Sequence, residues 1–380
     1  MKVKVRIAIK VYVIMAFLNA ISSVVVHGIL LNKFLTITGL IGAIYLIVTI
    51  DIYEQLRRFN RNRKVLSEDG TYIEAPEFRL LYYKLYGEYE KKINKLRTAC
   101  LNRMYLLIVP SIIFVIITAA KFSESNNQIK KYILLFIIFV MIMISSKAEE
   151  CRKKYIRIYK DEILFSFMKL INPNLEYNEF GARENIEKIY RNSRLETMVF
   201  DYLKVDDIIS GQISEKTYVD IANVCAVDEY YTFNNIRKKR KIFEGLFSAS
   251  KCASEIKGTI KIKRQFKSVT SFEKKQKVEL DNQTFESLYD VYCIDDNLAF
   301  RILTPDIMEK LANLGKYGFD IEISIKDSKI CTRIGMGPMF EPSIIKGALD
   351  KDELYTYYCV IKFIVDLTES VNKSLETFVS

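Results

Sequence analysis

Histidine, tryptophan and closely spaced cysteines are missing or nearly missing from this sequence of 380 residues. His27 is the single histidine, so the chain after it lacks the imidazole of a catalytic triad or of a histidine acid–base pair. No Cys-x-x-Cys pair occurs, which excludes a zinc site built from paired ligands, and no glycine-rich phosphate motif is present. We therefore expect no catalytic residue, metal ligand or cofactor.

The cysteines are odd in number and dispersed along the chain, which argues against a disulfide framework. We expect these cysteines to behave as small buried hydrophobic residues in a reducing compartment. The seven are Cys100, Cys151, Cys225, Cys252, Cys293, Cys331 and Cys359.

Hydrophobic residues form 50% of the chain, and the long apolar runs all lie before Lys147. These runs lack charged residues and a polar face, so we interpret them as membrane-spanning helices rather than buried core helices. The last is short for a bilayer, so its flanking lysines would reach toward the headgroups. The predicted segments are 11–32, 34–50, 104–120 and 132–146, which form two hairpins.

Lysine and arginine gather before the first predicted segment, between the second and third, and after the fourth. Basic residues mark the cytoplasmic side of membrane helices. This pattern predicts a multi-pass protein of the cell membrane with both termini and the large C-terminal domain in the cytoplasm. An alternative for residues 1–23 is a signal peptide, which would still leave that domain inside. The net charge of +11 fits basic helix flanks and an anionic membrane surface.

After Pro173 the pattern changes to short strands mixed with helices, which indicates an α+β domain with a mainly antiparallel sheet. Thr304 and Pro305 predict a helix start, and a long helix is expected at 352–377. Asp327 and Ser328 are expected to form a hairpin turn. The predicted strands are 207–213, 217–227, 242–250, 258–263, 319–325 and 329–334.

Two further helices flank the second membrane hairpin. One carries an apolar stripe from Phe78 to Cys100, and the other is a basic helix after Ser146. They could form an antiparallel stalk, or each could pack on the sheet domain. The expected division is an N-terminal transmembrane hairpin, a cytoplasmic helical region, a second transmembrane hairpin, a cytoplasmic stalk helix and the α+β domain, at 1–50, 51–103, 104–147, 148–173 and 174–380 respectively.

Several short motifs from this region occur in a recognisable order. They are Phe243-Glu244-Gly245-Leu246-Phe247, the segment from Phe285 to Tyr292, Ile302-Leu303-Thr304-Pro305 and Phe340-Glu341-Pro342. Together they resemble bacterial membrane proteins that carry the domain of unknown function 3137, over about residues 80–380. The resemblance implies a helical membrane hairpin followed by a cytoplasmic α+β domain. It implies no activity, substrate or cofactor.

A few polar positions could carry chemistry. The paired carboxylates Asp206-Asp207 and Asp295-Asp296 could bind a divalent cation, although turn and cap roles are the simpler interpretation. Cys293 is interpreted as a buried thiol rather than a nucleophile. Gly335-Met336-Gly337 is interpreted as a turn.

The densest charge is the block Arg237, Lys238, Lys239, Arg240 and Lys241. A solvated hairpin loop is one interpretation, and contact with anionic inner-leaflet lipids or with a protein partner is the functional one. Aromatic residues do not alternate with these charges, so nucleic acid is the weakest candidate partner.

These observations favour a membrane-anchored interaction or regulatory module whose partners are the lipid bilayer and an unidentified protein. A first alternative is a membrane-associated, metal-dependent enzyme that uses carboxylates. A second is a small transporter or channel component, although no ionisable residue lies in the middle of a predicted membrane segment.

Overall fold

The computed structural model describes residues 75–376, except for 107–108, 111–112, 114–116, 118–126, 179–182, 197, 233–234, 236, 257, 266–275, 317, 338, 343 and 345–346. The first two predicted membrane segments and most of the third lie outside the described residues. The described residues divide into two compact units. The first contains Glu88–Tyr159 and Pro342–Ala348, and the second contains 75–87, Lys160–Glu341 and 349–376.

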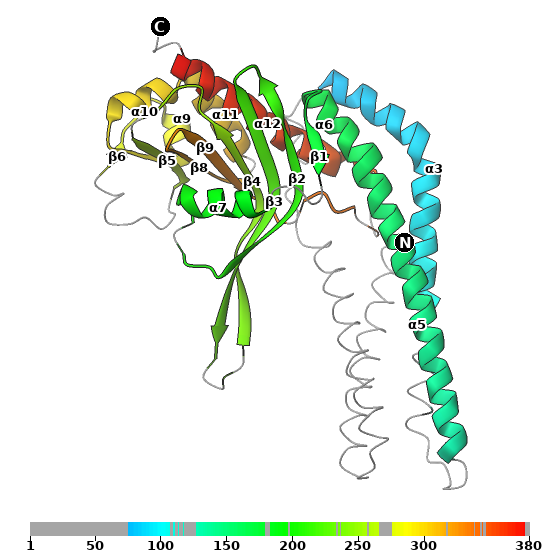
Figure 1. The fold of residues 1–380 in the computed structure, drawn as a ribbon. Helices are drawn as coiled ribbons and strands as arrows, with labels where there is room; N and C mark the ends of the chain where they lie inside the picture. Colours follow the sequence, from blue (N-terminus) through cyan, green and yellow to red (C-terminus); the bar gives the residue numbers. More distant parts are fainter. Residues whose placement is uncertain are drawn as a thin grey trace. The chain divides into compact units, whose positions relative to one another are not determined.

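Two long helices, α3 (Pro76–Leu106) and α5 (Asn127–Ile158), dominate the first unit (Figure 1). Among the described residues one helical stretch, Tyr132–Ile171, is long and apolar enough to cross a membrane, and 17% of its most apolar window is buried. Large apolar side chains on it are exposed, with Phe136 at 66% and Phe139 at 59%. A core helix of a soluble protein would bury such side chains. The fourth predicted membrane segment therefore lies in a helix that is long and apolar enough to cross a membrane and keeps large apolar side chains exposed.

The two helices contact each other near the end of α3. Arg103 Nη1 donates a hydrogen bond to the Lys147 carbonyl oxygen at 2.8 Å and also contacts Cys151 Sγ. Cys100, one turn earlier on α3, lies next to the side chain of Cys151. Because the earlier residue of α3 meets the later residue of α5, the helices run antiparallel here.

The second unit is built on one nine-stranded sheet in the described residues, and every strand pair in it is antiparallel. This confirms the predicted mainly antiparallel sheet. The strand order is β1-β2-β3-β4-β9-β8-β5-β7-β6. The strands are β1 (Glu176–Asn178), β2 (Tyr202–Ser214), β3 (Thr217–Tyr231), β4 (Arg237–Lys251), β5 (Thr259–Arg264), β6 (Lys277–Val278), β7 (Tyr289–Cys293), β8 (Asp320–Lys326) and β9 (Lys329–Gly335).

Helices cover both faces of this sheet (Figure 1). On one face Tyr190 of α7 packs against the rings of Phe243 and Phe247, with the Phe247 ring centre at 5.0 Å. On the other face lie α11 and α12. The helical segments of this unit are η2 (Tyr159–Leu164), a π-helical turn, and α6 (Phe165–Ile171), α7 (Arg183–Ser193), α9 (Gln283–Glu286), α10 (Asp296–Ile302), α11 (Pro305–Lys316) and α12 (Lys351–Glu376).

The N-terminal end of α3 belongs to the second unit and is held there by aromatic packing. Phe78 is fully buried, and its ring centre lies 4.9 Å from those of both Phe167 on α6 and Tyr355 on α12. Offset and edge-on ring pairs of this kind contribute about 0.5–1.5 kcal/mol each beyond the area that they bury.

Several elements lie where local sequence patterns predicted them. Asp327 and Ser328 both have positive φ, at 50° and 55°, as a two-residue hairpin turn between β8 and β9 requires. Pro305 begins α11, as predicted, and the Thr304 carbonyl oxygen accepts from Met308 N at 3.0 Å. Strand ends were less accurate, because β4 begins at Arg237 rather than at 242.

The contact between α3 and α5 predicts a specific cross-link. Oxidation of the full chain in membranes with copper phenanthroline should join Cys100 to Cys151, because the two side chains are neighbours across the helix pair and neighbouring cysteines can be bridged with little backbone movement. The product should migrate faster on a non-reducing gel. Cys100→Ser should abolish it, whereas Cys225→Ser, on β3, should leave it unchanged. A cross-link that survives Cys100→Ser would contradict this helix pairing.

Candidate functional site

Lys160 is a charged residue placed where the chain leaves α5 and enters the second unit. It is the second residue of η2, the π-helical turn Tyr159–Leu164. Such turns are rare and occur often at functional positions. Apolar neighbours Ile163 and Leu164 are buried, and the Lys160 side chain itself is only 9% exposed. An ammonium group so far from water requires opposite charge nearby.

A bulge in β2 supplies the first such charge. The pairing of β2 with β3 shifts between Asp206 and Ile209, and Asp207 within the bulge has a φ of 52°. Aspartate tolerates this left-handed conformation better than most residues. The two adjacent carboxylates consequently differ in environment: the Asp206 side chain is 62% exposed, and that of Asp207 is 3% exposed.

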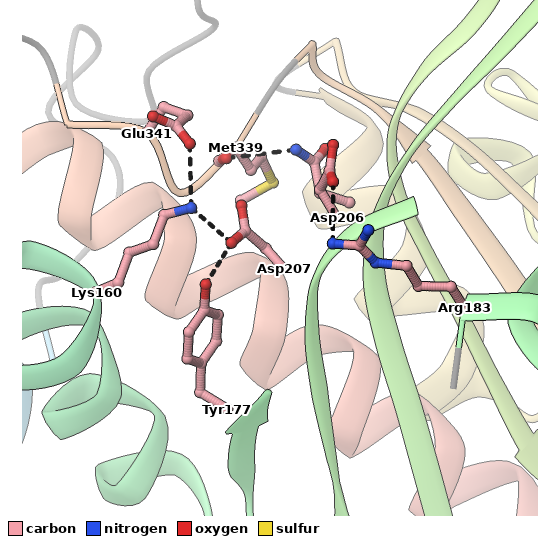
Figure 2. A network of polar contacts seen from close by, with 8 residues as sticks. Lys160, Tyr177, Arg183, Asp206, Asp207, Met339 and Glu341 are labelled. Carbon is pink, nitrogen blue, oxygen red and sulfur yellow. Dashed lines mark hydrogen bonds and ion pairs between the residues drawn. The ribbon is translucent and has the colours of Figure 1, made fainter. Parts of the chain in front are cut away.

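These residues meet in a buried ion network (Figure 2). Lys160 Nζ lies 2.6 Å from Asp207 Oδ1 and 3.0 Å from Glu341 Oε1. Tyr177 of β1 donates its hydroxyl hydrogen to the same oxygen of Asp207. One ammonium group therefore joins η2, β2 and the segment after β9.

The segment that carries Glu341 is fixed by its neighbour. Phe340 is fully buried, has a φ of 63°, and lies edge-on to the ring of Tyr357 on α12 at 5.4 Å. At the rim of the network Arg183 Nη2 lies 3.5 Å from Asp206 Oδ1. Asn223 Nδ2 lies 3.5 Å from the Met339 carbonyl oxygen. The aromatic anchor at Phe340 thus presents the next side chain, Glu341, to Lys160 (Figure 2).

The charge state of Lys160 limits what the network can do. Burial by itself lowers the pKa of Lys160, but the carboxylates of Glu341 and Asp207 outweigh it, and the net pKa is raised. The ion-pair stabilisation is therefore complete below the ordinary lysine pKa and is lost only as the pH rises through the raised value. A lysine that stays protonated is not a nucleophile. The geometry suits a fixed structural joint.

A second buried cluster lies within the sheet. Arg333 of β9 donates to Glu196 at 2.6 Å and to Glu322 of β8 at 2.8 Å. Its guanidinium carbon lies 5.0 Å from the ring centre of Phe243. All three ionic side chains are at least nine-tenths buried. Burial lowers the pKa of Arg333, but Glu322 and Glu196 outweigh it and the pKa is raised.

The other polar positions that the sequence singled out have structural roles. Asp295 caps α10, with its Oδ1 accepting from Asn297 N at 3.1 Å. Cys293 Sγ donates to the Asp295 carbonyl oxygen at 3.1 Å, and burial raises the pKa of this thiol. Gly337 has a φ of 79° in a turn. In the part of the chain that the structure describes, no three His, Cys, Asp or Glu side chains converge as a metal site.

The basic block 237–241 lies in a strand, so its interpretation as a loop was wrong. It forms the first part of β4 and pairs with residues 227–231 of β3. The reason is charge complementarity across the ladder: Arg240 lies 2.8 Å from Asp228, and Glu229 pairs with both Arg237 and Lys239. Sequence reasoning treated the block as a run of like charge and did not consider the acidic residues of the preceding strand.

Sequence reasoning also missed both buried clusters. Glu322 stands between Ile321 and Ile323 on a strand, a pattern that normally places the carboxylate on a solvated face. Lys160 has polar neighbours on its helix and gives no local sign of burial. Two signals touched the Lys160 network without revealing it: the pair Asp206-Asp207 was considered as a cation site, and the motif Phe340-Glu341-Pro342 brought Glu341 to notice without a role.

The Lys160 network predicts a large loss of stability on truncation. Lys160→Met should lower the free energy of unfolding by about 3–5 kcal/mol, because it leaves Asp207 charged and buried without its partner. Urea denaturation of the full chain in detergent, followed by far-UV circular dichroism, measures this. Lys310→Met is the matched control: its pair with Asp306 is exposed and should contribute at most about 1 kcal/mol. Equal effects of the two substitutions would refute a structural role for the network.

The Arg333 cluster predicts that a positive charge at position 333 is not enough to keep the full stability of the second unit. Arg333→Met should destabilise the second unit by about 3–5 kcal/mol, and Arg333→Lys should recover only part of this. One ammonium group cannot reproduce two separate guanidinium hydrogen bonds to Glu196 and Glu322. The same denaturation experiment reports both variants. Full recovery by lysine would show that the paired geometry is unimportant.

Comparisons with known proteins give limited but specific information. No curated protein matches the chain. A crystal structure of the mycobacterial trehalose monomycolate transport factor A, TtfA, is similar at 11% sequence identity, with a TM-score of 0.30, over 57% of this chain and 97% of that chain. This likeness is too weak to transfer a fold or a function. Residues 241–373 match the sequence model of the family described as protein of unknown function DUF3137, which confirms the resemblance over that segment.

Proposed function

We propose that this chain is a multi-pass membrane protein whose sheet domain is a cytoplasmic interaction or regulatory module. The observation that carries the proposal is the helix that continues from α5 into η2. Its apolar stretch is largely unburied, and a few residues later Lys160 is fixed to the sheet by buried ion pairs. The helix that contains the proposed membrane segment therefore continues, without a break in the chain, into residues that belong to the folded domain.

The proposed topology has four membrane helices in two hairpins, with both termini and the domain in the cytoplasm. Its support is the gathering of Lys and Arg before the first segment, between the second and third, and after the fourth. Arg152 and Lys154 follow the exposed stretch of α5 closely. Basic residues there favour the cytoplasmic side for the end that leads into the sheet domain.

An interaction role fits the state of the polar groups in the described residues. Lys160 is held protonated, Asp295 caps a helix, and the Cys293 thiol has a raised pKa. Each of these three groups contributes to the fold. We expect the sheet domain to contact a partner through its exposed and charged side chains.

Reporter fusions test the topology. Alkaline phosphatase fused after Ser380 should be inactive, and green fluorescent protein fused there should fluoresce, because the C-terminus is placed inside. Phosphatase fused after Ser125, in the proposed outer loop, should be active. The chain should also remain in the pellet after alkaline carbonate extraction of membranes. Active phosphatase after Ser380, or release by carbonate, would overturn the proposed arrangement.

Affinity capture tests the interaction role. The full chain, captured from detergent-solubilised membranes, should recover a partner in larger amount than the Arg333→Met chain does, since that variant keeps the membrane helices but has a destabilised sheet domain. Lys310→Met is the folded control and should retain the partner. Recovery of the same proteins by all three chains, or of none by the wild type, would contradict an interaction module.

A further inference from the structure

We propose that the end of the β3–β4 hairpin docks on anionic lipid headgroups. The inference rests on the proposed function, because it requires that membrane helices hold the sheet domain at a bilayer. The docking surface, called the basic ribbon below, consists of residues 228–231 of β3 and 237–241 of β4.

The basic ribbon extends beyond the neighbouring strands. Pairing of β2 with β3 begins at Tyr202 and Val227, and pairing of β4 with β9 ends at Gly245 and Gly335. Past these points the two strands pair only with each other among the described residues. Figure 1 shows them projecting from the sheet as a narrow two-stranded arm. Near its base Glu229 N donates to Asp201 Oδ2 and Lys239 Nζ lies 3.1 Å from the Tyr202 hydroxyl oxygen, while the side chains of residues 230–231 and 237–241 are exposed.

Positive charge is in excess on this arm. Asp228 and Glu229 neutralise part of it, and Glu229 is shared between Arg237 and Lys239, whose Nζ lies 3.0 Å from it. Lys241 pairs with Glu244 at the base of the arm. Lys238 forms no ion pair with the residues that the structure describes. Five basic side chains thus face three acidic ones, and all five basic residues are exposed.

Tyrosines accompany the surplus charge. Tyr230 is 43% exposed and lies opposite Lys238, while Tyr231 is 67% exposed and lies opposite Arg237. Alternate residues of a strand point to opposite faces, so each face of the arm carries one tyrosine beside one cation. Tyrosine combines an apolar ring with a polar hydroxyl and favours the membrane–water interface. The pairing of ring and cation on both faces fits a headgroup layer.

The attraction between the basic ribbon and anionic headgroups is weak, so the contact requires that the sheet domain be anchored to the membrane. A basic residue near an anionic leaflet gains about 1 kcal/mol. A surplus of two charges would not bind a free protein to vesicles, but an arm on an anchored domain meets lipid at a high effective concentration. The contact should therefore form only in the anchored chain. It should weaken as salt shortens the range of the charges.

Basic residues on a strand with free edges also prevent pairing between molecules. That role predicts no response to lipid charge. A phosphate backbone of nucleic acid offers the same negative charge as the headgroups, so a short RNA serves as a competing probe. One experiment distinguishes the lipid contact from protection against pairing between molecules and from nucleic-acid binding.

The experiment is hydrogen–deuterium exchange of the full chain in nanodiscs of phosphatidylcholine, with and without phosphatidylglycerol. Backbone amides of the basic ribbon should exchange more slowly in the anionic discs, and raised salt should remove the difference. Arg237→Gln, Lys238→Gln and Lys239→Gln together should abolish it. The matched control removes three exposed positive charges elsewhere, by Lys216→Gln, Lys316→Gln and Lys362→Gln, and should keep it.

Equal exchange in the two kinds of disc, with the chain incorporated, would overturn the lipid contact and leave the membrane anchor standing. Loss of the difference in the control variant would show that net charge, not the ribbon, is responsible. Protection of the ribbon by RNA in neutral discs, without an effect of phosphatidylglycerol, would assign it to nucleic acid. A chain that does not enter discs at all would contradict the anchor and the contact together.

Discussion

The burial of one ammonium group, that of Lys160, sets the constraint on which the arrangement of the second unit depends. A buried cation destabilises a fold by several kcal/mol unless carboxylates surround it. That requirement fixes where Asp207 and Glu341 must lie. The bulge in β2 and the left-handed backbone at Phe340 are the two local distortions that bring those carboxylates to one point. Both distortions cost energy on their own, and the surrounding contacts hold them in place, the ion pair at Asp207 and the packing against Tyr357 at Phe340.

The same network includes the π-helical turn η2, which connects α5 to α6. The π-helical turn places Lys160 inside while Ile163 and Leu164 are also buried. Directly after it, α6 contributes Phe167 to the aromatic cluster around Phe78. Charge and apolar packing therefore act on successive turns of one chain, and the chain that emerges from the apolar stretch of α5 is attached to the sheet domain by two independent kinds of interaction.

How much of the fold and of the site could be predicted from the sequence depended on how far apart along the chain the interacting residues lie. The β8–β9 turn at Asp327 and Ser328, the start of α11 at Pro305 and the apolar stretch of α5 are local patterns, and each was predicted. The contact between Lys160 and Glu341 joins residues far apart in the chain, and the type of each residue alone suggests exposure. The start of β4 was missed for a related reason: its charges are acceptable in a strand only because β3 places acids opposite them.

The distribution of charge links the buried clusters to the surface. Each cluster pairs one buried cation with two carboxylates, of which Glu341 stays 32% exposed while Asp207, Glu196 and Glu322 are buried. Lys160 and Arg333 both have raised pKa values, so these two cations keep their charge near neutral pH. A change in how this surface attracts an anionic partner would then come from the composition of the partner, or from salt, rather than from titration of either buried cation.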